Sequence, residues 1–270
     1  MKRKAAALIL AVLLCLCSAV ARADSPGVLR VLAQGDDPAA SWSGTAFAVG
    51  IQGEDSQIFL TNRHVALGKG DCDEVTLWLL RGDEKIPCSL LAASDGYPDV
   101  AVIRAEEPIP GCPALALMSS RQVRNGTAVC SLGYSGTGEF LQSQGTVTES
   151  LRMAKAGLTR CLIHTAAIDH GCSGGPLLNE DGVVVGLNTY GLAEEDRFCA
   201  VYTDYAMDML EDLGIEFTQT PGPGIIPTAV SNLLRLPNLP DPVGYGIFAA
   251  GAGLVLWLLF PPKKRKNHFN

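Results

Sequence analysis

Hydrophobic residues occur along most of the chain in short runs separated by glycine and other turn-forming residues. Eleven such runs lie between residues 27 and 202: 28–32, 45–49, 58–61, 75–80, 86–92, 100–103, 127–132, 145–148, 161–163, 183–188 and 198–202. Short apolar runs bounded by turn signals are typical of β-strands in a barrel or sandwich. We therefore expect an all-β domain over these residues.

A helical period follows the last of these runs. In the segment from Ala206 to Ile215, the side chains of Met207, Leu210 and Leu213 fall on one face of a helix. This spacing predicts a short amphipathic helix that packs against the β domain.

The first 23 residues have the pattern of a signal peptide. Residues 1–4 are basic after the initial methionine, residues 5–20 are apolar, and Ala21-Arg22-Ala23 has the small residues of a signal-peptidase site. We expect export and a mature chain that starts near Asp24. An uncleaved N-terminal anchor is the alternative.

The composition changes again after the predicted helix. Residues 218–242 are rich in proline and glycine, which predicts an extended stalk. Residues 243–260 carry no charge and as a helix would measure about 27 Å, enough for a hydrocarbon core of about 30 Å. The tail, 261–270, contains four consecutive basic residues and should be cytoplasmic. We predict a single-pass protein of the cell membrane with residues 24–217 as an extracytoplasmic domain, and a buried core helix at 243–260 is the alternative.

Charge and cysteine content restrict the partners. Residues 24–262 hold 13 Lys and Arg against 28 Asp and Glu, a formal balance of −15, which argues against nucleic acid because phosphate binding needs a basic patch. Seven cysteines follow the signal peptide, none of them in a Cys-x-x-Cys pair. That spacing disfavours a zinc or thioredoxin-type site, and no metal or cofactor is implied. Export permits disulfides, but the odd count leaves at least one thiol over, for which Cys112 is a candidate.

The segment Gly171-Cys172-Ser173-Gly174-Gly175-Pro176, which precedes an apolar run, indicates a nucleophile. A serine between glycines can sit on a sharp loop whose N–H groups converge on one point, and that point can hold the oxygen that becomes negative in acyl transfer. A Gly/Ser turn before a buried strand is the simpler interpretation, but six matching positions are hard to reach by chance.

A serine nucleophile needs a base and an acid to orient that base. His64 ends an apolar run at a strand-to-loop junction and is the better base, whereas His164 and His170 lie in the serine's own approach segment. His268 lies beyond the predicted anchor. Asp99 stands at the start of a buried strand and is the predicted acid.

Five blocks of sequence resemble the chymotrypsin-fold serine proteases, and within them the HtrA-like (Deg) branch. These blocks are residues 43–47, 60–65, 99–103, 165–179 and 186–189, in the order His, Asp, Ser of chymotrypsin-type enzymes. The resemblance covers about residues 27–208. It implies two six-stranded antiparallel barrels, with a short C-terminal helix, and a triad of His64, Asp99 and Ser173 in the cleft between them. The N–H groups of Gly171 and Ser173 would form the oxyanion hole.

Two features depart from that branch. No PDZ-like module follows the protease domain, so the trimeric assembly of HtrA proteins is not implied and the oligomeric state is open. Cys172 stands where trypsins have Asp and HtrA proteins usually have Asn, so activation by a new N-terminus is not expected. A disulfide between Cys172 and Cys199 is one possibility. A cysteine protease that uses Cys172 is a competing interpretation, disfavoured because Ser173 directly precedes the paired glycines.

The resemblance also locates a specificity pocket, formed by the segment before the serine and by a later strand. Its predicted residues are Ala167, Ile168, Gly186, Leu187, Asn188 and Thr189. A trypsin-like pocket needs a carboxylate six residues before the nucleophile, and that position is Ala167. With Ile168 narrowing the pocket, we expect cleavage after small or medium aliphatic residues.

The sequence therefore predicts a membrane-anchored serine endopeptidase that acts on protein or peptide substrates. An inactive protease-fold binding module at the cell surface is the alternative from another class. An esterase on the same barrels is a second alternative.

Overall fold

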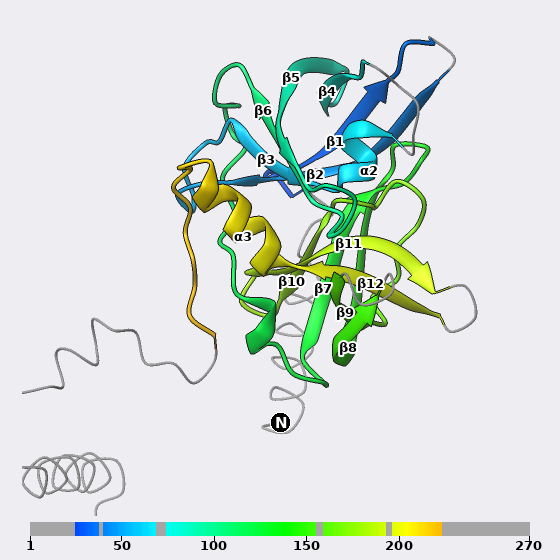
Figure 1. The fold of residues 1–270 in the computed structure, drawn as a ribbon, viewed down its shortest axis with the longest axis vertical. Coiled ribbons are helices and arrows are strands. Elements are labelled where there is room, and N and C mark those ends of the chain that lie inside the picture. The colour runs from blue at the N-terminus through cyan, green and yellow to red at the C-terminus, as the bar shows by residue number, and fades with distance from the viewer. Residues whose placement is uncertain (1–24, 38–39, 69–73, 155–158, 193–195, 223–270) are drawn as a thin grey trace, which may run out of the picture. The chain divides into compact units, whose positions relative to one another are not determined.

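The computed structural model describes residues 25–37, 40–68, 74–154, 159–192 and 196–222. Over these residues the chain forms twelve β-strands, two α-helices and one 3₁₀ turn (Figure 1). The strands divide into two closed barrels of six antiparallel strands each, which follow one another along the chain. The expected all-β fold of two six-stranded barrels is thereby confirmed.

The first barrel is built from strands that lie before residue 106. They are β1 (Val28–Gln34), β2 (Ser41–Val49), β3 (Ile58–Thr61), β4 (Thr76–Arg81), β5 (Glu84–Ala93) and β6 (Ala101–Ala105). Their order around the barrel is β1-β2-β3-β6-β5-β4, and pairing of β1 with β4 closes it. Side chains that alternate inward along these strands, among them Val31, Phe59, Leu79 and Ile103, fill its core.

The second barrel follows in the chain. Its strands are β7 (Ala128–Tyr134), β8 (Phe140–Ala154), β9 (Thr159–His164), β10 (Pro176–Asn179), β11 (Val184–Leu192) and β12 (Arg197–Tyr202). They run in the order β10-β11-β12-β9-β8-β7, and pairing of β10 with β7 closes the barrel. Leu162, Leu177 and Val185 are among the residues of its core.

A further core cluster joins the two barrels and the helix α3 (Thr203–Asp212). It contains Phe47 of the first barrel, Leu187 of the second, and Ala206, Met207 and Leu210 of the helix. Burying this apolar surface favours one fixed arrangement of the barrels, because about 25 cal/mol is gained per Å² removed from water. The shared core therefore holds the two barrels in a fixed relative position.

The local elements differ from the prediction at three places. Strand β10 and the short helix α2 (Arg63–Leu67) were not predicted, and the 15 residues of β8 extend well beyond the predicted run 145–148. The prediction missed most of β8 because many of its positions are polar and half-buried or exposed, so they form no apolar run. Antiparallel pairing with β9 nevertheless makes these residues part of the strand. The predicted helix is present, but its Leu213 is 38% exposed and caps the helix instead of packing under it.

The predicted signal peptide (1–23), membrane segment (243–260) and basic tail (261–270) lie outside the described residues. Within the described part of the chain, no helix combines the length and hydrophobicity needed to cross a membrane. The first residues of the predicted stalk, 218–242, pair with the domain: the N–H of Leu117 donates to the Thr218 carbonyl at 2.9 Å, and the N–H of Thr220 donates to the Leu117 carbonyl at 2.7 Å. Residues 218–220 thus belong to the folded domain.

Candidate active site

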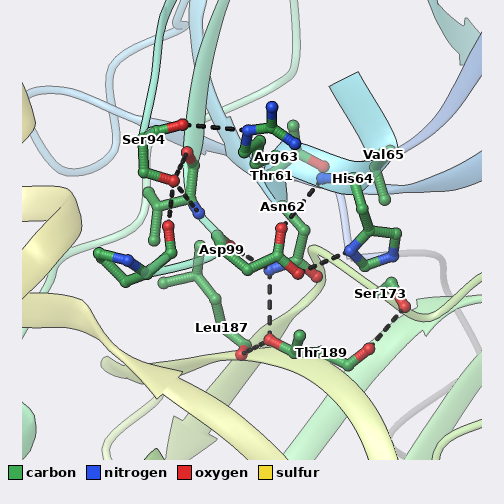
Figure 2. A network of polar contacts seen from close by, with 12 residues as sticks. Thr61, Asn62, Arg63, His64, Val65, Ser94, Asp99, Ser173, Leu187 and Thr189 are labelled. Carbon is green, nitrogen blue, oxygen red and sulfur yellow. Dashed lines mark hydrogen bonds and ion pairs between the residues drawn. The ribbon is translucent and has the colours of Figure 1, made fainter. Parts of the chain in front are cut away.

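His64 and Asp99 lie close together because β3 ends and its antiparallel neighbour β6 begins at the same edge of the first barrel. His64 lies in α2, three residues after β3, and Asp99 lies two residues before β6, while Thr61 of β3 pairs with Ala101 of β6. The Nδ1 atom of His64 is 2.6 Å from Oδ2 of Asp99, and the backbone N–H of His64 donates to Oδ1 of Asp99 at 2.9 Å (Figure 2). A carboxylate can only accept, so in the neutral imidazole Nδ1 carries the hydrogen and Nε2 has the lone pair.

Ser173 lies in the loop between β9 and β10, on the second barrel. Figure 2 shows its side chain next to the His64 ring, on the side of the imidazole away from Asp99. The Ser173 hydroxyl donates to the Thr189 carbonyl at 2.9 Å. His64, Asp99 and Ser173 all line one cavity of about 1360 Å³ between the barrels. The structure thus brings the three predicted catalytic residues together.

Asn62 links Asp99 to Thr189 of the second barrel, and the sequence analysis did not identify this link. Its buried side-chain amide donates to the Asp99 carbonyl at 2.8 Å and to the Thr189 hydroxyl at 3.2 Å. The Thr189 hydroxyl donates in turn to the Leu187 carbonyl at 3.1 Å (Figure 2). The sequence shows only that a polar residue directly follows the apolar run 58–61, two residues before His64, and its burial is known from the structure alone.

The loop that carries Ser173 is held in a tightly packed form. Gly171 has φ of +98°, and a Cβ atom there would lie 2.6 Å from the carbonyl oxygen of Tyr134. Only glycine fits this conformation and this contact. The N–H of Cys172 donates to the Asp169 carbonyl at 3.0 Å, and the N–H of Gly174 donates to the Asn188 carbonyl at 2.8 Å.

The N–H groups of Gly171 and Ser173 differ from their neighbours. Within the described residues neither donates a hydrogen bond, whereas the N–H groups of Cys172, Gly174 and Gly175 in the same loop do. Both residues line the cavity. Two unused donors beside a candidate nucleophile are the feature that an oxyanion hole requires.

The predicted specificity residues separate into two groups. Ile168 and Thr189 line the cavity, whereas Gly186, Leu187 and Asn188 are buried inside the protein and Ala167 faces solvent. In place of those four residues, the lining continues through Tyr190, Gly191 and Leu192 of β11. The register of β11 against β12 shifts between Asn188 and Tyr190, and such a bulge re-aims the side chains that follow it. The part of β11 that lines the cavity therefore begins at Thr189, after Gly186, Leu187 and Asn188.

The other described histidines lie in different environments. His164 is completely buried, and burial lowers its pKa from 6.5 to about 4. His170 is exposed, and its backbone N–H donates to its neighbour Asp169 at 2.7 Å. Among the described histidines, His64 is the one whose ring nitrogen contacts a carboxylate. It is therefore the histidine best placed to act as a base.

Cys172 is a buried thiol, 1% exposed, and it is not joined to Cys199 in this structure. Burial raises the pKa of the Cys172 thiol, which disfavours the thiolate that a cysteine nucleophile needs. The described residues contain no cluster of His, Cys, Asp or Glu side chains that could hold a metal ion.

Comparison with known proteins identifies the family. The sequence pattern of the trypsin-like peptidase domain matches residues 44–187, which include all three of these residues. The chain belongs to the trypsin-like peptidase family. Among sequence relatives, this trypsin-like peptidase is 31% identical over 223 residues to the mitochondrial serine protease HTRA2 of Bos taurus, and 31% identical over 176 residues to a probable periplasmic DegP-like serine endoprotease of Hahella chejuensis. The predicted HtrA-like resemblance is thereby confirmed.

The coverage of these relatives is partial. The alignments include 76% and 63% of this chain but 46% and 35% of the two relatives, so this peptidase spans less than half of either. In fold, it is similar to the active form of the Rv3671c protease from M. tuberculosis, with a TM-score of 0.57, 21% identity, and coverage of 72% of this chain and 83% of that one. The comparisons support the predicted enzyme class, a serine-type endopeptidase.

Proposed function

We propose that this trypsin-like peptidase is a membrane-anchored, extracytoplasmic serine endopeptidase with His64, Asp99 and Ser173 as its catalytic triad. The observation that carries the proposal is that His64 and Asp99 are joined by two hydrogen bonds and line the same cavity as Ser173. The loop amides of Gly171 and Ser173, which have no acceptor of their own within the described residues, support an oxyanion hole at the same place.

The reaction follows from this arrangement. The Ser173 hydroxyl turns from the Thr189 carbonyl towards Nε2 of His64, gives up its proton there, and adds to the carbonyl carbon of the scissile peptide bond. Asp99 stabilises the imidazolium that forms, and the Gly171 and Ser173 amides bind the carbonyl oxygen as it becomes negative. The C–N bond then breaks, and His64 returns the proton to the leaving amine. Water hydrolyses the acyl-enzyme by the same steps, with His64 again acting first as base and then as acid.

The walls of the cavity support a preference for small or medium aliphatic residues before the scissile bond. Ile168 lines the cavity together with Ser173, and no carboxylate stands at position 167. Asp169, the acidic residue nearest the serine in sequence, is exposed and accepts the backbone N–H of His170 at 2.7 Å. Asp169 also lines the cavity, and we infer that it lies at the rim and does not provide a counter-charge for Lys or Arg at the pocket floor.

The anchored, extracytoplasmic location rests on the sequence and on one relative. The uncharged segment 243–260 and the basic tail after it give the orientation, with the tail inside. The DegP-like relative is described as periplasmic. Protease added to intact cells should cut within residues 223–242 and release a soluble, active domain. A domain that stays protected until the cells are lysed would contradict this orientation.

Hydrolysis by the purified full chain tests the proposed activity. The wild-type chain should cleave fluorescein-labelled casein, and Ser173→Ala and His64→Ala should each abolish cleavage, because triad members act as a unit. If the wild-type chain cleaves no better than Ser173→Ala, the alternative of an inactive protease-fold binding module takes its place. Equal loss of casein cleavage in both variants, with unchanged thermal unfolding, would support the triad.

A further inference from the structure

Thr45, in the middle of β2, contacts the Ser173 loop from the first barrel. It is fully buried, and all of its polar groups are hydrogen-bonded. Its N–H donates to the Ser173 carbonyl at 2.8 Å, and its hydroxyl donates to the Gly171 carbonyl at 2.8 Å. Its own carbonyl accepts the Thr61 hydroxyl at 2.7 Å. One residue of the first barrel therefore holds two carbonyl groups of the loop in the second.

The same hydroxyl also accepts a hydrogen bond from the second barrel. The N–H of Tyr134, the last residue of β7, donates to the Thr45 hydroxyl at 2.9 Å. Gly171 packs closely against the Tyr134 carbonyl, because a Cβ atom at Gly171 would lie only 2.6 Å from the carbonyl oxygen. A hydroxyl has one donor and two acceptor sites, so Thr45 bridges the end of β7 and the loop that lies on it.

These contacts bear on the direction of the loop amides. A peptide group is planar and trans, so its N–H points opposite to its C=O. The Cys172 carbonyl accepts the N–H of Gly175 at 3.0 Å, which directs the N–H of Ser173 to the other side of that peptide. Thr45 fixes the peptide groups on both sides of it, through the carbonyls of Gly171 and Ser173. The orientation of the Ser173 N–H is thus set from three points.

We propose that Thr45 is a positioning residue for the oxyanion hole. Its hydroxyl bridges the N–H of Tyr134 and the carbonyl of Gly171, and it holds the Gly171–Ser173 loop in the form that directs its unused amides at the substrate carbonyl oxygen. Thr45 does not touch the reacting atoms. The inference rests on the proposed peptidase function, because it concerns how the oxyanion of that reaction is bound.

Thr45→Val is the direct test, because valine keeps the β-branched shape and removes the hydroxyl. Loss of a direct oxyanion donor lowers kcat by about 10²- to 10³-fold, and an indirect effect on both donors should lower it by roughly 10- to 100-fold. KM for a peptide p-nitroanilide with Val before the scissile bond should stay within about threefold, since ground-state binding is not affected. A matching peptide aldehyde, whose hemiacetal oxygen occupies the oxyanion position, should bind more weakly by the same factor as kcat falls.

Thr45→Ser and Thr45→Cys complete the series. Serine restores the hydroxyl and should recover kcat to within about threefold of wild type, whereas cysteine offers a weak donor and should give an intermediate kcat. Both are smaller than threonine, so they test the hydroxyl even if Thr45→Val does not fold. A kcat for Thr45→Ser as low as that of Thr45→Val would overturn the proposal, because restoring the hydroxyl would then not restore kcat.

Thr203→Val is the matched control. Thr203 is also fully buried, and its hydroxyl donates to the Met118 carbonyl at 2.5 Å, away from the Ser173 loop. This variant should lose stability and keep kcat. The proposal is wrong if the wild-type chain is active and Thr45→Val retains its kcat, or if Thr203→Val lowers kcat by the same factor. An inactive wild-type chain would instead contradict the proposed peptidase function, and this inference with it.

Discussion

His64 and Asp99 are joined twice, once through the imidazole at 2.6 Å and once through the backbone N–H of His64 at 2.9 Å. The two bonds fix both the ring and the start of α2 relative to the carboxylate. Because Thr61 and Ala101 pair next to them, this geometry comes from the β3–β6 ladder and not from a flexible loop. A site built on paired strands needs little rearrangement when substrate binds.

Replacing Asp99 by Asn should leave the fold intact and lower kcat by about three to four orders of magnitude. An amide can donate to Nδ1 and stabilise the tautomer in which Nε2 carries the hydrogen, so the base loses its lone pair. Steady-state hydrolysis of the Val p-nitroanilide measures the effect. Asp95→Asn is the control, since Asp95 lies in the same connection at an exposed position and should keep full activity. Equal activity in the two variants would exclude Asp99 as the acid.

His164 should make the domain less stable in mild acid. Burial lowers its pKa to about 4 from 6.5, so between these values the unfolded chain binds the proton more readily than the folded one. Stability therefore falls as the pH drops from about 6.5 towards 4, by about 2 kcal/mol at pH 5. Urea unfolding at pH 7 and pH 5 should show this loss, and His164→Gln should reduce it. An unchanged pH dependence in His164→Gln would show that other groups cause it.

The Cys172 thiol should be inert in the folded protein. It is buried and its pKa is raised, so little thiolate forms near neutral pH. Iodoacetamide should not inhibit the native chain, and Cys172→Ala should retain hydrolysis. Mass spectrometry of the alkylated protein locates the modified cysteines. Inhibition that follows modification of Cys172, together with an inactive Cys172→Ala, would favour the cysteine protease interpretation.

Cleavage should occur after Val, Ala or Leu, with about 1 to 3 kcal/mol of discrimination per methylene. A peptide library with each amino acid before the scissile bond, analysed by mass spectrometry, measures this profile. Ile168→Ala should extend the profile towards Phe and Tyr by opening the cavity wall. A wild-type profile dominated by Lys and Arg would show that Asp169 reaches the pocket, and one dominated by Phe and Tyr would show that Ile168 does not close it.

The sequence predicted the elements that depend on local pattern. The apolar run 58–61 is strand β3 without any change of bounds, and the order of the motifs led to the correct family. It did not predict β10, whose four residues begin with Pro176 and become a strand only by pairing with both β7 and β11. Pairing between distant segments leaves no local period.

The same distinction separates the site residues. His64, Asp99 and Ser173 lie in motifs that could be identified from sequence, and the structure brings them together. Of the predicted pocket residues, Gly186, Leu187 and Asn188 do not line the cavity, because the bulge after Asn188 changes which side chains face it. The links made by Asn62 and Thr45 also depend on how the two barrels face each other, which no spacing along the chain records.

The central claim is that Ser173 is the nucleophile. The most direct test is to identify the residue that a fluorophosphonate probe labels on the full chain. We predict one covalent adduct per chain on the Ser173 hydroxyl, located by tandem mass spectrometry of the peptide that contains it. His64→Ala should slow this labelling strongly, because the hydroxyl then has no base. No adduct on the folded wild-type chain, or an adduct on another residue that persists in Ser173→Ala, would contradict the account.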